Sequence, residues 1–290
     1  MNCYIINFNR LKWTKQLAID LADRGFTPII LDYNSSDFKF KLVKFNQNHG
    51  HRVFYHSGFY REVKSEYFAM TDPDLDITCA PEDFEEVLMK GFSAKHEFIG
   101  NNDDIIKVGL NLKIDDLPEK SEDLIFDPVN VISHEKGYGG GETKKGLYIA
   151  AQLDTTFAIY KNHGPEFGQR REYSLWPSIR TAPPYEARHL PWYSTYSGLD
   201  EEDKYYMNSI VKKDVDWSWR MKCNIDQKLH SINHDDSAPI EVEVEIGQGG
   251  VLESKQQENI YKNKDLDNLS ASAHLSNPPQ RVYINPKHDS

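Results

Sequence analysis

Three alternating carboxylates follow a short apolar segment in the stretch EYFAMTDPDLDI, residues 66–77. Asp72 and Asp74 flank Pro73, whose ring fixes its own backbone and removes one donor of a β-ladder, so the chain turns there. Two carboxylates at a turn can aim oxygens at one point. Mg²⁺ and Mn²⁺ prefer oxygen ligands, and Mg²⁺ often takes one or two protein carboxylates together with phosphates and waters. The spacing indicates a divalent-cation site beside a diphosphate, and the alternative is a solvated turn.

A later stretch, RTAPPYEARHLPWYSTYS, places one histidine and two arginines among aromatic residues. The neutral imidazole of His189 could complete a carboxylate metal site, and Arg180 or Arg188 could neutralise diphosphate oxygens. Aromatic rings beside polar groups also suit the C–H-rich faces of sugars. The alternative is a surface loop whose aromatic side chains pack on the core and whose histidine is only hydrogen-bonded.

Short strands alternate with a helical pattern in the first part of the chain. Strands are predicted over residues 3–8, 26–32, 52–57 and 66–72, with a helix over 11–25. This alternation predicts an α/β fold with a mainly parallel, twisted sheet flanked by helices, whose ligand site lies off the carboxyl ends of the strands. Asn7, Asp32 and Asp72 stand at such ends.

The middle of the chain shows a further helix, further strands and a Gly-rich loop. Residues 81–92 predict a helix, and further strands are predicted over 107–114 and 147–160. The Gly-rich residues 135–146 predict a mobile surface loop, because no helical pattern follows them as a phosphate-binding loop requires.

The expected domains are a core over residues 1–197, a helical segment packed on it over 198–234, and an appendage or partly flexible tail over 235–290. In the tail, IEVEVEI alternates as an exposed strand does and could join a second subunit.

Composition excludes several classes of protein. The 290 residues include 34 Lys and Arg against 45 Asp and Glu, a net charge of −11, which disfavours a general nucleic-acid binder. Three cysteines without CxxC spacing indicate a reducing compartment. No basic segment followed by an apolar run opens the chain, and no run is long enough to span a membrane, so we expect a soluble cytoplasmic protein.

Several segments in order resemble one family of enzymes. They are YIINFNRLKWTKQLAIDLADRG, IILDYNSSD, YFAMTDPDLDI, KVGLNLKIDDLP, LDTTFAIY and YEARHLPWY. Together they resemble a GT-A-fold nucleotide-sugar glycosyltransferase of the family 2 type, including bacterial and viral members, over about residues 1 to 197. The resemblance implies a single GT-A-type, Rossmann-like domain. It also implies transfer of a sugar from a nucleoside-diphosphate donor, with UDP favoured, to a hydroxyl group of a glycan, lipid or protein.

The resemblance also implies roles for particular residues. In such enzymes the first strand end and the acidic residue after the second strand hold the nucleotide, so Asn7, Asn9 and Asp32 become its base and ribose contacts. Asp72 and Asp74 become the D-x-D pair that binds Mn²⁺ or Mg²⁺, with Asp74 the more direct ligand.

The later residues receive roles in the same way. His189 resembles the histidine that supplies a late metal contact beside the diphosphate, and Arg188 becomes a diphosphate contact. Asp76 is expected to be structural.

An inverting reaction also needs a base for the acceptor hydroxyl. The candidate is Asp154 in QLDTTF, because burial in this apolar segment would raise its pKa toward useful basicity. The alternatives are that Asp154 caps a turn through Thr155 and Thr156, and that Glu186 is the base. Here the sequence departs from the common family picture, in which an acidic pair starts a helix.

Two other functions compete with the glycosyltransferase reading. A sugar nucleotidyltransferase shares the broad fold but usually begins with a Gly-rich, basic signature that INFNRLKW lacks. A non-catalytic carbohydrate-binding module could use Trp192 and the tyrosines near it. The donor sugar and the acceptor cannot be read from the sequence, because small differences in a pocket decide such choices.

Overall fold

The computed structural model describes residues 1–33, 39–46, 50, 53–94, 105–138, 144–151, 153, 156–162 and 178–212. All of them fall in the first of two units of the chain, residues 1–249, and the second unit lies outside the described residues. Within the described part no helix combines the length and apolar character needed to cross a bilayer.

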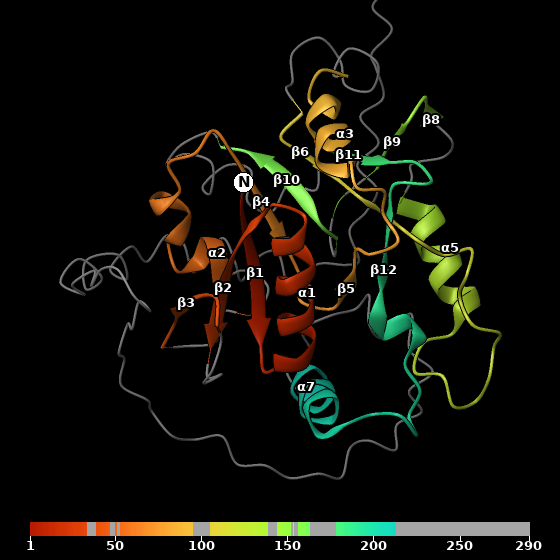
Figure 1. The fold of residues 1–290 in the computed structure, drawn as a ribbon. Coiled ribbons are helices and arrows are strands. Elements are labelled where there is room, and N and C mark those ends of the chain that lie inside the picture. The colour runs from red at the N-terminus through yellow and green to blue at the C-terminus, as the bar shows by residue number, and fades with distance from the viewer. Residues whose placement is uncertain are drawn as a thin grey trace, which may run out of the picture. The chain divides into compact units, whose positions relative to one another are not determined.

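Two sheets and five helices make up the described elements (Figure 1). The larger sheet contains β1 (Asn2–Phe8), β2 (Thr27–Tyr33), β3 (Lys41–Lys44), β4 (Tyr67–Thr71), β6 (Lys107–Gly109), β8 (Lys144–Lys145), β9 (Tyr148–Ala150), β10 (Ala158–Lys161) and β11 (Ser178–Thr181). The smaller sheet contains β5 (Leu75–Asp76), β7 (Asn111–Leu112) and β12 (Glu186–His189). The helices are α1 (Leu11–Asp23), α2 (Val53–His56), α3 (Phe84–Gly91), α5 (Pro128–Tyr138) and α7 (Glu201–Lys212), with 3-10 turns η2 (Phe59–Glu62) and η4 (Leu190–Tyr193).

The larger sheet has nine described strands in the order β3-β2-β1-β4-β10-β6-β11-β9-β8. The four strands from β3 to β4 are parallel, whereas β10 is antiparallel to both of its neighbours and β9 is antiparallel to β11. The predicted α/β fold, Rossmann-like with a large sheet flanked by helices, is confirmed. The sheet is parallel in its first half and mixed in the rest.

Helix α1 connects β1 to β2 and lies against both strands. Its buried residues Thr14, Leu17, Ala18 and Leu21 follow helical spacing, and burial of such an apolar stripe is what stabilises a helix of this length. Two residues after the helix, Gly25 adopts a φ of +83°, a left-handed conformation that glycine adopts without steric cost.

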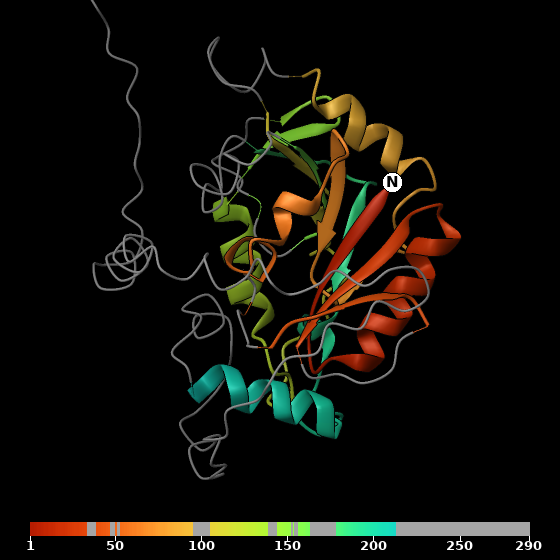
Figure 2. The ribbon, with the colours of Figure 1, turned by 90° about the vertical axis from the view of Figure 1, so that its left-hand side faces the viewer.

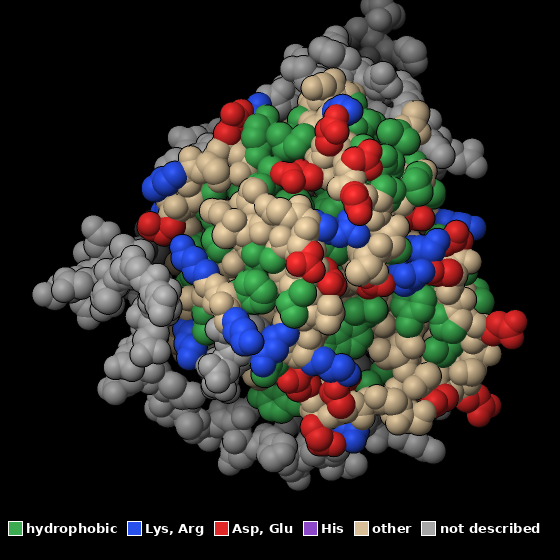
Figure 3. All heavy atoms as spheres, in the orientation of Figure 1, with side chains coloured by type: hydrophobic (Ala, Val, Ile, Leu, Met, Phe, Trp, Pro, Cys, Tyr) green, Lys and Arg blue, Asp and Glu red, His purple; other side chains and the backbone are tan. Residues whose placement is uncertain are grey.

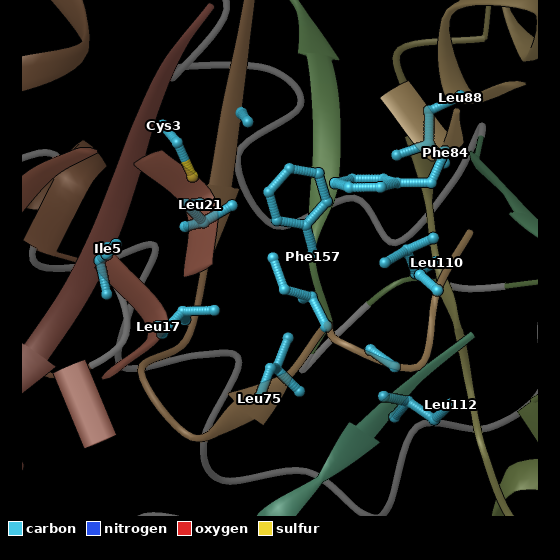
Figure 4. Close-up of a cluster of buried hydrophobic side chains, with 14 of the residues drawn as sticks. Cys3, Ile5, Leu17, Leu21, Leu75, Phe84, Leu88, Leu110, Leu112 and Phe157 are labelled. Atoms are coloured by element: carbon cyan, nitrogen blue, oxygen red, sulfur yellow. The ribbon is translucent and has the colours of Figure 1, made fainter. Parts of the chain in front are cut away.

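The large sheet is covered on both faces. Figure 2 shows α1 and α3 on one side of the strands and α2 on the other. Alternation along β1 sends Cys3 and Ile5 into the core beneath α1, while Tyr4 joins the second core beneath α2. In Figure 4, Phe157 and Phe84 meet edge to face between Leu21 and Leu88, with their ring centroids 5.4 Å apart.

One predicted strand is wrong. Residues 52–57 were expected to form the third strand, but Val53–His56 is the short helix α2, and β3 is formed by Lys41–Lys44. The apolar run still reaches the core, because Val53 and Phe54 are buried. A short apolar run does not distinguish a buried strand from a buried helical turn.

Other predicted elements are divided or extended. The strand expected over 107–114 is split into β6 and β7, and the described parts of 147–160 contain β9 and β10 in separate positions of the sheet. Residues 135–138 of the predicted Gly-rich loop form the end of α5. Helix α7 falls within the predicted segment 198–234, and the predicted tail over 235–290 lies outside the described residues.

Charged side chains are unevenly spread on the face seen in Figure 3. Acidic side chains gather over α3, and Lys and Arg side chains stand among acidic ones over the lower part of that face. Glu85 and Glu86 in the first turn of α3 complement the positive end of the helix dipole, so this acidic group has a structural explanation.

Candidate functional site

The order of the strands marks one place where a ligand site is expected. The chain runs outward from β1 to β2 and β3, and then returns to place β4 on the other side of β1. In open α/β sheets ligands bind beyond the carboxyl ends of the strands at such a switch point. Arg10 follows β1 and Asp74 follows β4, so these two residues flank the switch point.

The turn after β1 is built around the side-chain amide of Asn7. Its Oδ1 accepts a hydrogen bond from the backbone N–H of Arg10 at 3.2 Å and lies 2.7 Å from the hydroxyl of Thr14. Its Nδ2 donates to Asp32 Oδ1 at 2.7 Å, which ties the ends of β1 and β2 together. Asn9 sits in the same turn at a φ of +51°, which asparagine tolerates better than most residues.

Asp74 and Arg10 form a buried ion pair at the switch point. The Arg10 guanidinium contacts Asp74 Oδ2, and both residues are 3% exposed. Burial opposes the charged carboxylate, but the neighbouring His189 and Arg10 outweigh it and hold the pKa of Asp74 below its usual value. The same pairing raises the pKa of Arg10 despite burial, so the pair is ionised near neutral pH.

His189 reaches the same carboxylate from a distant part of the sequence. Its Nε2 lies 3.5 Å from Asp74 Oδ2, and the imidazole is buried. Strand β12 pairs with β5, and the backbone N–H of Leu190 donates to the Asp74 carbonyl at 2.9 Å. The ring of Trp192 packs on the imidazole with centroids 4.9 Å apart. Backbone pairing and ring packing therefore fix the position of His189 beside Asp74.

Helix α7 closes the group on a third side. Asp203 Oδ1 lies 3.7 Å from the Arg10 guanidinium, and the Tyr206 ring stacks on it with its centroid 3.9 Å from Cζ. Burial raises the pKa of Asp203. Both views in Figures 1 and 2 place α7 at the end of the sheet toward which β1 points.

Other predicted residues lie elsewhere in the structure. Arg188 is bound by Asp116 through Nε at 2.8 Å and by Asp76 through a terminal nitrogen at 3.2 Å. Because successive side chains of a strand point to opposite faces, Arg188 and Glu186 face away from His189 on β12. The structure therefore places Arg188 in an ion-pair group of its own, apart from Asp74.

Glu186 has polar partners on that second face of β12. Its Oε1 accepts a hydrogen bond from Asn111 Nδ2 at 2.9 Å, and burial raises its pKa.

The remaining predicted site residues differ in exposure. Asn7 and Asp32 are 3% and 0% exposed and bind each other, whereas Asn9 and Asp72 are half-buried. Asp154, the predicted base, lies outside the described residues.

Sequence reasoning missed Arg10 as a member of this site. A charged residue directly after a buried strand end, in the dipeptide Asn9-Arg10, is the signal that could have found it.

The donor set can be compared with the needs of a divalent cation. Asp74 Oδ1 is buried and has no hydrogen-bond partner among the described residues, and it belongs to the carboxylate that His189 approaches. Within the described ranges no group of three or more His, Cys, Asp or Glu side chains gathers. Mg²⁺ commonly binds one or two protein carboxylates and takes its other ligands from substrate phosphates and waters. Asp74 offers one such carboxylate, with Oδ1 unbonded and the His189 imidazole beside Oδ2, and a cation bound at Oδ2 would have to displace Arg10 from it.

Comparisons with known proteins give only distant structural neighbours. No family model matches the chain, and no curated protein matches it. The structure of S. aureus TarS 1-349 aligns with a TM-score of 0.39 and 10% sequence identity, over 78% of this chain and 67% of that one. The inositol-1-phosphate CTP transferase from T. maritima aligns with a TM-score of 0.34 and 12% identity, over 74% and 97%.

Proposed function

We propose that this protein is a GT-A-type glycosyltransferase that uses a nucleoside-diphosphate sugar as its donor. The observation that supports this most is the meeting of Asp74, His189 and Arg10 at the switch point between β1 and β4. Three segments far apart in sequence bring an acid, an imidazole and a guanidinium into one buried group there. A group with these charges suits a cation and a diphosphate rather than an apolar ligand.

The donor diphosphate would lie against Asp74 and His189, and the nucleoside would extend over the ends of β1 and β2. Asn9 is the partly exposed amide in that direction, so we assign it the direct nucleoside contact. Asn7 and Asp32 are buried and bound to each other, and in this proposal they hold the turn that presents Asn9. Asp72, half-buried at the end of β4, would contribute negative charge beside the cation.

The chemistry follows from the bond that must break. The acceptor hydroxyl oxygen forms a bond to the anomeric carbon while the bond from that carbon to the diphosphate oxygen breaks. The electron pair remains on the diphosphate, and a bound Mn²⁺ or Mg²⁺ would stabilise that charge. For inversion, the acceptor proton passes to a carboxylate on the opposite face of the sugar.

Asp154 is our candidate for the base. Glu186, the reserve candidate, lies on the face of β12 opposite to His189.

The first experiment measures nucleotide and cation binding by thermal shift. Melting is followed with UDP, GDP, CDP and ADP, each with and without Mn²⁺, because a ligand that binds only the folded protein raises its stability. At a ligand concentration of about 100 Kd the gain is about 2.7 kcal/mol, which is readily resolved. We expect UDP with Mn²⁺ to stabilise most, and stabilisation by no diphosphate would contradict the proposal.

A second set of assays separates the competing functions. Hydrolysis of a UDP-sugar on long incubation, which releases UDP, supports a transferase that uses water as a slow acceptor. Release of pyrophosphate from UTP and a sugar phosphate would favour a nucleotidyltransferase. Glycan binding that is indifferent to UDP and Mn²⁺, with no donor turnover, would favour a carbohydrate-binding module.

A further inference from the structure

Arg10 occupies the place of a counter-ion at Asp74. Its guanidinium contacts Oδ2, the oxygen that also faces His189, while Oδ1 makes no hydrogen bond within the described part of the chain. Arg10 is 3% exposed, so its charge is shielded little by water. A second cation at the same carboxylate would meet a buried positive charge at close range, and the two would repel.

A second carboxylate near Arg10 belongs to Asp203 on α7. Asp203 Oδ1 lies 3.7 Å from the guanidinium, beyond hydrogen-bond distance, and Tyr206 offers its ring face at 3.9 Å. Asp203 is buried, and its helix is held against the start of α1 by the Lys12 backbone N–H, which donates to Glu202 at 3.1 Å. A small rotation of the guanidinium would therefore exchange one carboxylate for the other without moving either helix.

We infer that Arg10 and Asp203 together set the cation affinity of the site. Arg10 neutralises Asp74 when the site holds no divalent cation. It shifts to Asp203 when the Asp74 carboxylate binds a cation that carries the diphosphate. Asp203 thus acts as a positioning residue that receives the displaced guanidinium. This inference rests on the proposed function, because it takes Asp74 and His189 as the cation-binding residues.

The test measures binding of Mn²⁺ at one fixed, saturating concentration of UDP, with the free ion followed by its EPR signal. R10M removes the competing charge and should bind Mn²⁺ about 10-fold more tightly than the wild type, while R10K should stay close to the wild type. D203N should weaken binding by about 10-fold, because the displaced Arg10 then has no acceptor; changes beside metal ligands typically alter affinity by about 10–100-fold. E201Q is the matched control, since Glu201 lies in the same first turn of α7 with an exposed side chain and pairs with exposed Lys204 at 2.8 Å.

The double variant R10M/D203N separates this account from a general charge effect. If Asp203 acts through Arg10, the double variant binds Mn²⁺ as R10M does. An equal loss from D203N in both backgrounds, or equal affinity of R10M and wild type, would overturn the inference. Should R10M fail to fold, the comparison of R10K, D203N and E201Q still decides it, because only D203N is expected to lose affinity.

The outcomes also separate this inference from the proposed function. Mn²⁺ binding that is lost in H189N but unchanged in R10M and D203N would remove the role of Arg10 and keep the cation site. Absence of Mn²⁺ binding from every variant would overturn both the inference and the cation site.

Discussion

Removing both partners of the Arg10–Asp74 ion pair should destabilise the protein far less than the sum of the two single removals. Each side chain is 4–5% exposed, so D74N leaves a buried guanidinium whose nearest remaining carboxylate, on Asp203, is 3.7 Å away. R10M leaves a buried carboxylate beside His189. Removing one partner of a buried pair typically costs about 3–5 kcal/mol. Asp203 and His189 each offset part of that loss, so we expect about 3 kcal/mol for either change.

The double variant R10M/D74N should cost much less than the sum. Once both charges are gone, neither partner of the pair is left buried alone, and such replacements are often close to neutral. The buried Asp203 carboxylate still loses its neighbour Arg10, which accounts for part of the remaining cost. We therefore expect about 2 kcal/mol for the double variant against about 6 kcal/mol for additive changes, an interaction of about 4 kcal/mol. For a domain of this size each kcal/mol moves Tm by about 2–4 °C, so each single variant should melt about 6–12 °C below the wild type.

The assay is urea and thermal unfolding followed by circular dichroism at pH 7. R188M is the control, because its partners Asp76 and Asp116 are partly exposed and the loss should stay within about 1 kcal/mol. A double variant whose cost equals the sum of the two single costs would refute the claim that Arg10 and Asp74 act as one buried pair.

Three further predictions concern the surroundings of this pair. The pKa of Asp74 is lowered from 3.8 in the folded protein, so its contribution to stability is present above that value and is lost as the pH falls through the folded pKa. The free energy of unfolding, measured in urea at pH 6 and pH 3, should therefore fall less in D74N than in the wild type. W192A should cost about 3–5 kcal/mol, since Trp192 is 1% exposed, and W192F should cost less; equal unfolding of W192A and wild type would contradict the packing described for His189. N7A should lower the free energy of unfolding by at least about 2 kcal/mol, because the buried Asp32 carboxylate loses a hydrogen-bond donor. N2A is the control and should unfold like the wild type, because Asn2 is exposed.

Three of the four strands in the parallel half of the sheet could be predicted because their signals are local. The runs at β1, β2 and β4 are apolar and the α1 pattern is regular, so each element follows from a short window. Residues 53–56 form a helix instead of a strand because the packing of Phe54 against Tyr4 and Phe68, which comes from distant segments, decides their conformation. The split of 107–114 at Leu110 likewise depends on two different partner strands.

The candidate site was predictable in part from its motifs and from the family resemblance that they carry. Asp74 and His189 were assigned to one site, and the structure puts their side chains 3.5 Å apart. The Arg10 contacts were not predictable, because Asp203 and Tyr206 lie more than one hundred residues later and only the docking of α7 brings them there. The separation of Arg188 from His189 follows from strand alternation, which required the bounds of β12.

The central claim is that Asp74 and His189 hold the diphosphate of a nucleotide donor through a divalent cation. Its most direct test is calorimetric titration of UDP, at saturating Mn²⁺, into wild type, H189N, D74N and D76N. D76N is the matched control, because Asp76 pairs with Arg188 on the other face of β12. We predict UDP binding by wild type and D76N alike, and a loss of at least about 10-fold in H189N and D74N. UDP binding of equal strength in wild type and H189N would contradict the claim.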